Sequence, residues 1–188
     1  MIENSLSLKD IFTILSEDSA LQYFNDLCII HKYTKHYLLL AEEISGEGAA
    51  FLQPLKEHRD AYDHLVRIFS LSNKNLSYKD SKEYAISNLK KAFGHEYRAF
   101  FDTMDWLTFI CRKYVCDYFS VEINKKRYLD KYDDFETIKS FINELPFVIA
   151  KYRDDKDVGA KNLILQEVLD YKETVDTLID IYRKIQLL

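Results

Sequence analysis

The fold is decided by residues 81–119, which read SKEYAISNLKKAFGHEYRAFFDTMDWLTFICRKYVCDYF. Apolar side chains recur in this segment at alternating spacings of three and four residues, the pattern of a helix that packs along one face. A continuous helix of this length spans about 58 Å, and Gly94 is its candidate position for a kink. The apolar stripe consists of Ile86, Leu89, Phe93, Tyr97, Phe100, Met104, Leu107, Cys111, Tyr114 and Tyr118.

A second face of the same predicted helix carries small and polar residues. Ala92 and Ala99 are seven residues apart, and small side chains at this spacing let another helix approach closely. We therefore expect this face to be buried too, which draws His95 and Asp102 into a contact between helices. A buried histidine or aspartate needs a hydrogen-bond partner.

Helical periodicity continues on both sides of this segment. The preceding helices are predicted over residues 5–17, 19–44 and 54–71, with Gly46 and Gly48 ending the second of them. After a charged connection over Lys125–Tyr132, a helix starts at Asp133 or Asp134, and Pro146 either kinks it or begins its successor. The last helix, 161–188, has another apolar stripe at Ile164, Val168, Tyr171, Val175, Leu178, Tyr182 and Ile185.

The composition agrees with long helices. The chain has 188 residues, of which only 4 are glycine and 2 are proline, so few tight turns are expected. We predict an all-α bundle of five to seven helices in a single domain, 1–188, with one long central helix and a long C-terminal helix. The C-terminal stripe packs either within the chain or against a second copy, so a homodimer is one expectation.

Charge and cysteine content restrict the class of function. The net charge of −5 argues against non-specific binding of duplex DNA. The three cysteines lack a CxxC spacing, which indicates a reducing compartment rather than a disulfide framework or a zinc site. No apolar run approaches the length of a membrane span. We expect a cytoplasmic protein that has no membrane contact, no cofactor and no metal.

The helix predicted from Pro54 combines an apolar stripe with a charged face over residues 56–69, KEHRDAYDHLVRIF. The polar side chains have two readings: an ion-pair ladder on a wet surface, or a network shared with the long helix. The expected core residues are Leu55, Tyr62, Leu65, Val66 and Phe69, and the network would contain Arg59, Asp60, His64, His95, Glu96, Arg98 and Asp102.

The hexapeptide from Arg59 to His64, Arg-Asp-Ala-Tyr-Asp-His, resembles the Arg-polar-x-x-x-His motif of the HEPN superfamily. Members of that superfamily are compact helical bundles, and Asp60 occupies the motif's polar position. The resemblance covers these six residues and the helical class. It implies a metal-independent endoribonuclease of a bacterial defence or toxin–antitoxin kind, which cleaves RNA at a composite cleft in a dimer.

The resemblance also implies roles for the motif residues. His64 assists the proton transfer that lets a 2′-hydroxyl attack phosphorus, Arg59 holds the phosphate, and Asp60 orients one of these side chains. Residues five apart on a helix lie 140° apart around its axis, so the pocket needs Arg59 to bend or a second copy to contribute. The predicted supporting residues are His95, Glu96, Arg98 and Asp102.

The alternative is a non-catalytic helical module that binds a protein partner or a sibling subunit. Some HEPN-like proteins are inactive modules of this kind. Other chemistries lack a signature, because the chain contains no phosphate-binding glycine loop, no nucleophile elbow and no HExxH motif. His31 and His36 are five residues apart and are expected to be ordinary histidines of the surface or the core edge.

Overall fold

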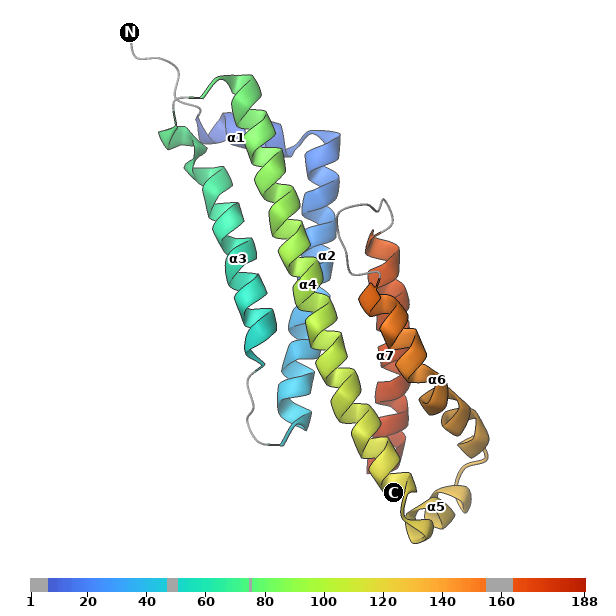
Figure 1. Cartoon of the computed structure of the whole chain (residues 1–188). Coiled ribbons are helices and arrows are strands. Elements are labelled where there is room, and N and C mark those ends of the chain that lie inside the picture. The colour runs from blue at the N-terminus through green and yellow to red at the C-terminus, as the bar shows by residue number, and fades with distance from the viewer. Residues whose placement is uncertain (1–6, 47–50, 75, 155–163) are drawn as a thin grey trace. The chain divides into compact units, whose positions relative to one another are not determined.

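The computed structural model describes residues 7–46, 51–74, 76–154 and 164–188. Within these ranges the regular structure consists of seven α-helices and one 3-10 turn (Figure 1), which confirms the predicted all-α bundle. None of the described helices is long and apolar enough to cross a membrane. The elements are α1 (Leu8–Leu15), α2 (Asp18–Ile44), α3 (Leu52–Phe69), η1 (Ser70–Asn73), α4 (Tyr78–Phe119), α5 (Glu122–Leu129), α6 (Phe135–Asp154) and α7 (Ile164–Gln186).

Helix α4 is the long helix that the apolar stripe predicts. It has 42 residues and runs without interruption through Gly94 (Figure 1), so its length is about 63 Å. Most of its apolar stripe, from Leu89 to Cys111, is buried, and so are Ala92 and Ala99 on the second face. Because both faces of its middle part are covered, polar residues such as Glu96 lie inside the protein.

One boundary differs from the sequence prediction, and one agrees with it. Gly46 follows α2 with a φ of 75°, the left-handed conformation that commonly ends a helix. The expected charged connection contains helix α5, whose Glu122 and Arg127 lie at the ends that the helix dipole favours. Helix α6 continues through Pro146 to Asp154, so the proline does not divide it. Gly48 and the predicted break over Arg153–Gly159 fall wholly or mostly outside the described residues.

The described residues group into two compact units, and helices α2 and α4 contribute to both. The N-terminal unit comprises the described residues within Met1–His36 and Phe51–Phe100, and the C-terminal unit comprises those within Tyr37–Ala50 and Phe101–Leu188. A single domain over 1–188 stays a prediction.

Helix α3 buries a different face from the predicted one, about 100° away around its axis. The expected core residues Leu55, Tyr62, Val66 and Phe69 are exposed, and Leu65 is half-buried, so this part of the prediction is wrong. The buried face carries Ala61, which permits a close approach, and polar groups that find partners on α4. That face consists of Pro54, Glu57, Ala61 and Ile68, with half-buried His58 and His64 beside them.

The C-terminal unit is organised around α7. Val168, Tyr171, Val175 and Leu178 are buried, as the C-terminal stripe predicts. The Tyr171 hydroxyl donates a hydrogen bond to Oδ1 of Asp105 at 2.7 Å, and Nε of Arg153 donates to Oδ2 at 2.9 Å. Burial, reinforced by the charge of Asp105, strongly raises the pKa of Tyr171. Each carboxylate oxygen of Asp105 thus accepts a hydrogen bond, and we interpret these contacts as structural.

Candidate functional site

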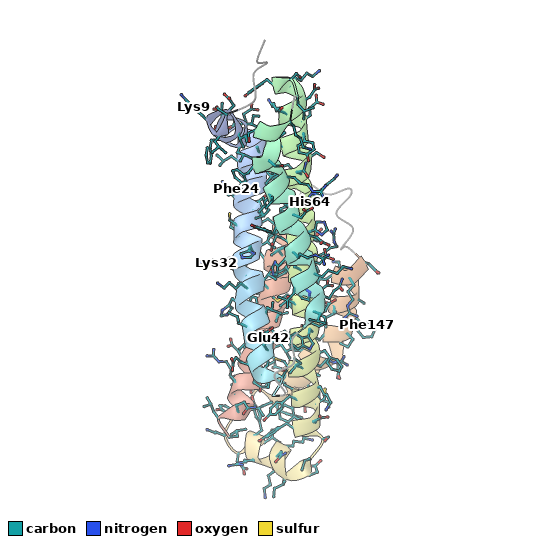
Figure 2. The ribbon with its side chains drawn as sticks, turned by 90° about the vertical axis from the view of Figure 1, so that its left-hand side faces the viewer. Lys9, Phe24, Lys32, Glu42, His64 and Phe147 are labelled. Atoms are coloured by element: carbon teal, nitrogen blue, oxygen red, sulfur yellow. The ribbon has the colours of Figure 1, made fainter. Side chains whose placement is uncertain are left out.

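The candidate site lies in the N-terminal unit, where α3 meets the first half of α4. Three side chains of α3 reach polar groups of α4 across this contact: Glu57, His58 and His64. Figure 2 labels His64 on α3 among the side chains drawn as sticks. The network reading therefore applies to these three side chains, while Asp63 and Arg67 form an exposed i,i+4 ion pair of the ladder reading.

His64 is held by Asn88. Its Nδ1 lies 2.9 Å from Oδ1 of Asn88, while Nδ2 of Asn88 donates to the carbonyl of Tyr84, also at 2.9 Å. The second bond fixes the orientation of the amide, so Oδ1 faces the imidazole and accepts its Nδ1 proton. In neutral His64 the lone pair is consequently on Nε2, the nitrogen available for proton transfer.

His95 is held by Glu57. Its Nδ1 lies 2.8 Å from Oε2 of Glu57, which also accepts from Nε of Arg98 at 3.0 Å. An Arg98 amino group lies 2.7 Å from the same Nδ1. A protonated Nδ1 donates to Glu57 and cannot also accept from Arg98. We assign the proton to the bond with Glu57, because a carboxylate is the stronger acceptor.

Glu57 is charged in this arrangement. Its side chain is only 10% exposed, and burial alone would raise its pKa. Hydrogen bonds from His95 and Arg98 outweigh burial, so the pKa of Glu57 is lowered. A buried carboxylate with two cationic or potentially cationic neighbours holds both of them in place.

The two imidazoles are stacked on one another. The ring centroids of His64 and His95 are 5.3 Å apart, with an interplanar angle of 23°. The Asp60 carboxylate accepts two hydrogen bonds from Arg59, at 2.9 and 2.6 Å. These bonds lower the pKa of Asp60, and the charge of His95 lowers it further. Asp60 therefore connects Arg59 electrostatically to the histidine pair.

A second cluster joins three helices through Glu96. The Glu96 side chain is 5% exposed, and its Oε1 and Oε2 lie 2.9 Å from Nδ1 of His58 and 3.2 Å from Nδ1 of His31. Burial would raise the pKa of Glu96, but the two histidines lower it by more. The hydrogen bond to Glu96 in turn raises the pKa of His31.

The structure brings together most of the predicted site residues, in two groups. Arg59, Asp60, His64, His95 and Arg98 belong to the histidine pair and its neighbours. Glu96 belongs to the other cluster, with His31 and His58. Asp102 is half-buried on α4 and belongs to the C-terminal unit.

Four residues of these clusters were not predicted as site residues: His31, His58, Glu57 and Asn88. The signal for Glu57 was the spacing of Pro54, Glu57, Ala61, His64 and Ile68, which is as regular as the apolar stripe. Hydrophobicity alone selected the wrong face of α3. Nothing in the sequence marks His31, because its partners come from two other helices.

The arrangement is suited to proton transfer next to an anion. It combines two imidazoles with ordered tautomers and two arginines whose forked donors match a phosphate. Comparisons with protein-family models, with curated proteins and with solved structures found no match.

Proposed function

We propose that the chain is a HEPN-like, metal-independent endoribonuclease of a bacterial defence or toxin–antitoxin system, with His64 and His95 as its proton-transfer groups. The observation that carries the proposal is the reciprocal anchoring of the stacked pair. His64 of α3 is held by Asn88 of α4, and His95 of α4 is held by Glu57 of α3. Each ring is fixed through Nδ1, which reserves Nε2 for the substrate.

This histidine pair can cleave RNA without a metal, because the two imidazoles account for every proton that is transferred. Neutral His64 accepts the 2′-hydroxyl proton at Nε2 while the 2′-oxygen forms a bond to phosphorus. The bond from phosphorus to the 5′-oxygen breaks, and protonated His95 gives its Nε2 proton to that oxygen. The products are a 2′,3′-cyclic phosphate and a free 5′-hydroxyl. Glu57 supplies the countercharge for protonated His95.

The arginines bind the phosphate. Arg98 lies beside His95, and its side chain is 38% exposed, so part of the guanidinium is open to a ligand. Arg59 is 69% exposed and forms an ion pair with Asp60. The charge of His95 in turn lowers the pKa of Asp60. In this assignment Arg98 binds the scissile phosphate. Arg59 binds an adjacent one or reaches the site of a second copy.

The test is cleavage of single-stranded RNA by the purified chain in EDTA, with detection of 2′,3′-cyclic phosphate ends. In His64→Asn the amide nitrogen replaces Nδ1 and keeps the bond to Asn88, but the nitrogen that exchanges a proton is gone. We expect unchanged folding and a loss of cleavage of about 10²- to 10⁴-fold. His95→Asn should behave alike.

The control is His36→Ala, which removes an exposed histidine of α2 that has no role in the proposal. Wild-type rates in His64→Asn, or cleavage that EDTA abolishes, would reject the assignment.

The second candidate function is a non-catalytic interaction module, and the outward face of α3 favours it. Here the exposed apolar residues Leu55, Tyr62, Val66 and Phe69 form a stripe at helical spacing, with Arg59 among them. Stripes of this kind are typical of helix–helix association. In this second proposal we assign the stripe to a homodimer contact, which cleavage by His64 and His95 of one chain does not require.

A further inference from the structure

The cluster around Glu96 has the composition of a transition-metal site. His31 of α2, His58 of α3 and Glu96 of α4 each offer one ligand atom, and these atoms lie within 4.8 Å of one another. The imidazole rings of His31 and His58 are 5.1 Å apart. Three helices of the N-terminal unit thus converge on one point.

We infer that His31, His58 and Glu96 bind a divalent transition-metal ion, and that the ion is Zn²⁺. Two imidazoles with one carboxylate form a recognised zinc ligand set, in which the fourth position is open. Mg²⁺ and Ca²⁺ prefer sites made of oxygen ligands alone. The inference does not depend on ribonuclease activity.

The geometry is close to what zinc requires. Tetrahedral bonds of about 2.0–2.2 Å place neighbouring ligand atoms about 3.3–3.5 Å apart. The Glu96 oxygens lie 2.9 and 3.2 Å from the two Nδ1 atoms, so these pairs need only small adjustments. All three ligand atoms lie within 4.8 Å of one another, and the His31 side chain, which is 51% exposed, is the one that we expect to rotate toward the ion.

The exposure pattern gives the ion an entry path. Glu96 is 5% exposed and His58 is 18% exposed, so two ligands are held inside the unit before the ion arrives. The third ligand, His31, is 51% exposed at the surface of the unit. A site of this kind keeps a solvent-facing coordination position.

Zinc binding moves the protons of both imidazoles. In the structure both Nδ1 atoms face a carboxylate, which accepts hydrogen bonds but cannot donate them while ionised. Each Nδ1 therefore carries a proton, and a zinc ion that binds at Nδ1 leaves the neutral ring with its proton on Nε2. Only an imidazole that is protonated on both nitrogens has to release a proton, so zinc affinity should rise with pH as the histidines become neutral.

The test is a calorimetric titration of the full chain with Zn²⁺. We expect one ion per chain and a Kd weakened about tenfold or more in His58→Ala and in Glu96→Gln. Glu96→Gln keeps the shape of the buried side chain but replaces one of its two acceptor oxygens with a donor amide and removes its charge. His31→Ala changes an exposed one, so this variant keeps the test valid if a buried variant fails to fold.

The control addresses the exposed thiols, since Cys28 and Cys116 are both free and exposed. The double variant Cys28→Ser/Cys116→Ser should bind Zn²⁺ like the wild type. Absence of saturable binding, wild-type affinity in Glu96→Gln, or loss of binding in the cysteine variant would each overturn the assignment.

Discussion

Asn88 on α4 accepts a hydrogen bond from Nδ1 of His64 on α3 at 2.9 Å. Together with the bond between Glu57 and His95, this contact fixes which side of α3 faces inward. The interior of the N-terminal unit is consequently more polar than the apolar pattern of its helices predicts.

Asn88→Ala should destabilise the protein. The variant removes the acceptor for a half-buried imidazole, and an unsatisfied group of this kind costs about 1–3 kcal/mol. The free energy of unfolding in denaturant measures the loss. Ser87→Ala, at the exposed neighbouring position, should change it by less than about 0.5 kcal/mol. Equal effects of the two variants would contradict the contact.

Two adjacent residues, Ala61 and Tyr62, test which face of α3 is buried. Ala61 is 1% exposed and Tyr62 is 68% exposed. Ala61→Leu should overfill the contact with a cost of about 1–3 kcal/mol, whereas Tyr62→Ser should cost less than about 0.5 kcal/mol. Chemical denaturation of both variants measures these changes in the free energy of unfolding. The opposite order would mean that the apolar stripe faces the core.

Stability should depend on pH through Glu96 and His31. The pKa of Glu96 is lowered from 4.5, so its contribution is present above pH 4.5 and is lost as the pH falls through the folded-state pKa. The pKa of His31 is raised from 6.5, so its contribution is present below pH 6.5 and is lost as the pH rises through the folded-state pKa.

Both contributions are therefore complete between pH 4.5 and 6.5. Unfolding in EDTA as a function of pH should show the largest difference between wild type and Glu96→Gln inside this window. A difference that stays constant from pH 4 to pH 9 would contradict the charged network.

Tyr171→Phe tests the C-terminal unit. The variant removes one hydrogen bond to Asp105 and leaves the bond from Arg153 in place. The expected loss is about 0.5–1.5 kcal/mol of unfolding free energy. Tyr62→Phe makes the same chemical change at an exposed tyrosine, so it should have almost no effect. A neutral Tyr171→Phe would show that the buried hydroxyl contributes nothing.

The outward stripe of α3 predicts association. The wild type should sediment as a dimer, and Tyr62→Glu/Val66→Glu should sediment as a folded monomer, because charges in the centre of an apolar contact remain unpaired. Circular dichroism checks that the variant stays helical. If the wild type sediments as a monomer at high protein concentration, the proposed homodimer contact is wrong.

The fold was largely predictable, because long segments repeat their apolar residues without interruption. The 81–119 stripe predicted α4, and Val168, Tyr171 and Val175 predicted the buried face of α7. Helix α5 escaped prediction because eight residues rich in charge have little periodicity, and its anchor is the single buried Tyr128.

The site was predictable only in part. His95, Arg98 and Asp60 were expected near His64, since α4 carried a matching polar face. The inward direction of α3 was not predictable from hydrophobicity, because the cost of burying Glu57 is offset by His95 and Arg98 on another helix. Such compensation depends on partners that are distant in sequence.

The outward stripe of α3 can be mutated separately from the histidine clusters. Leu55, Tyr62 and Val66 can be exchanged for glutamine or lysine without touching the histidine clusters, which use a different face of the helix. Solubility, crystallisation behaviour and self-association thus become adjustable independently of chemistry. A loss of activity in such a surface variant would then report the role of assembly alone.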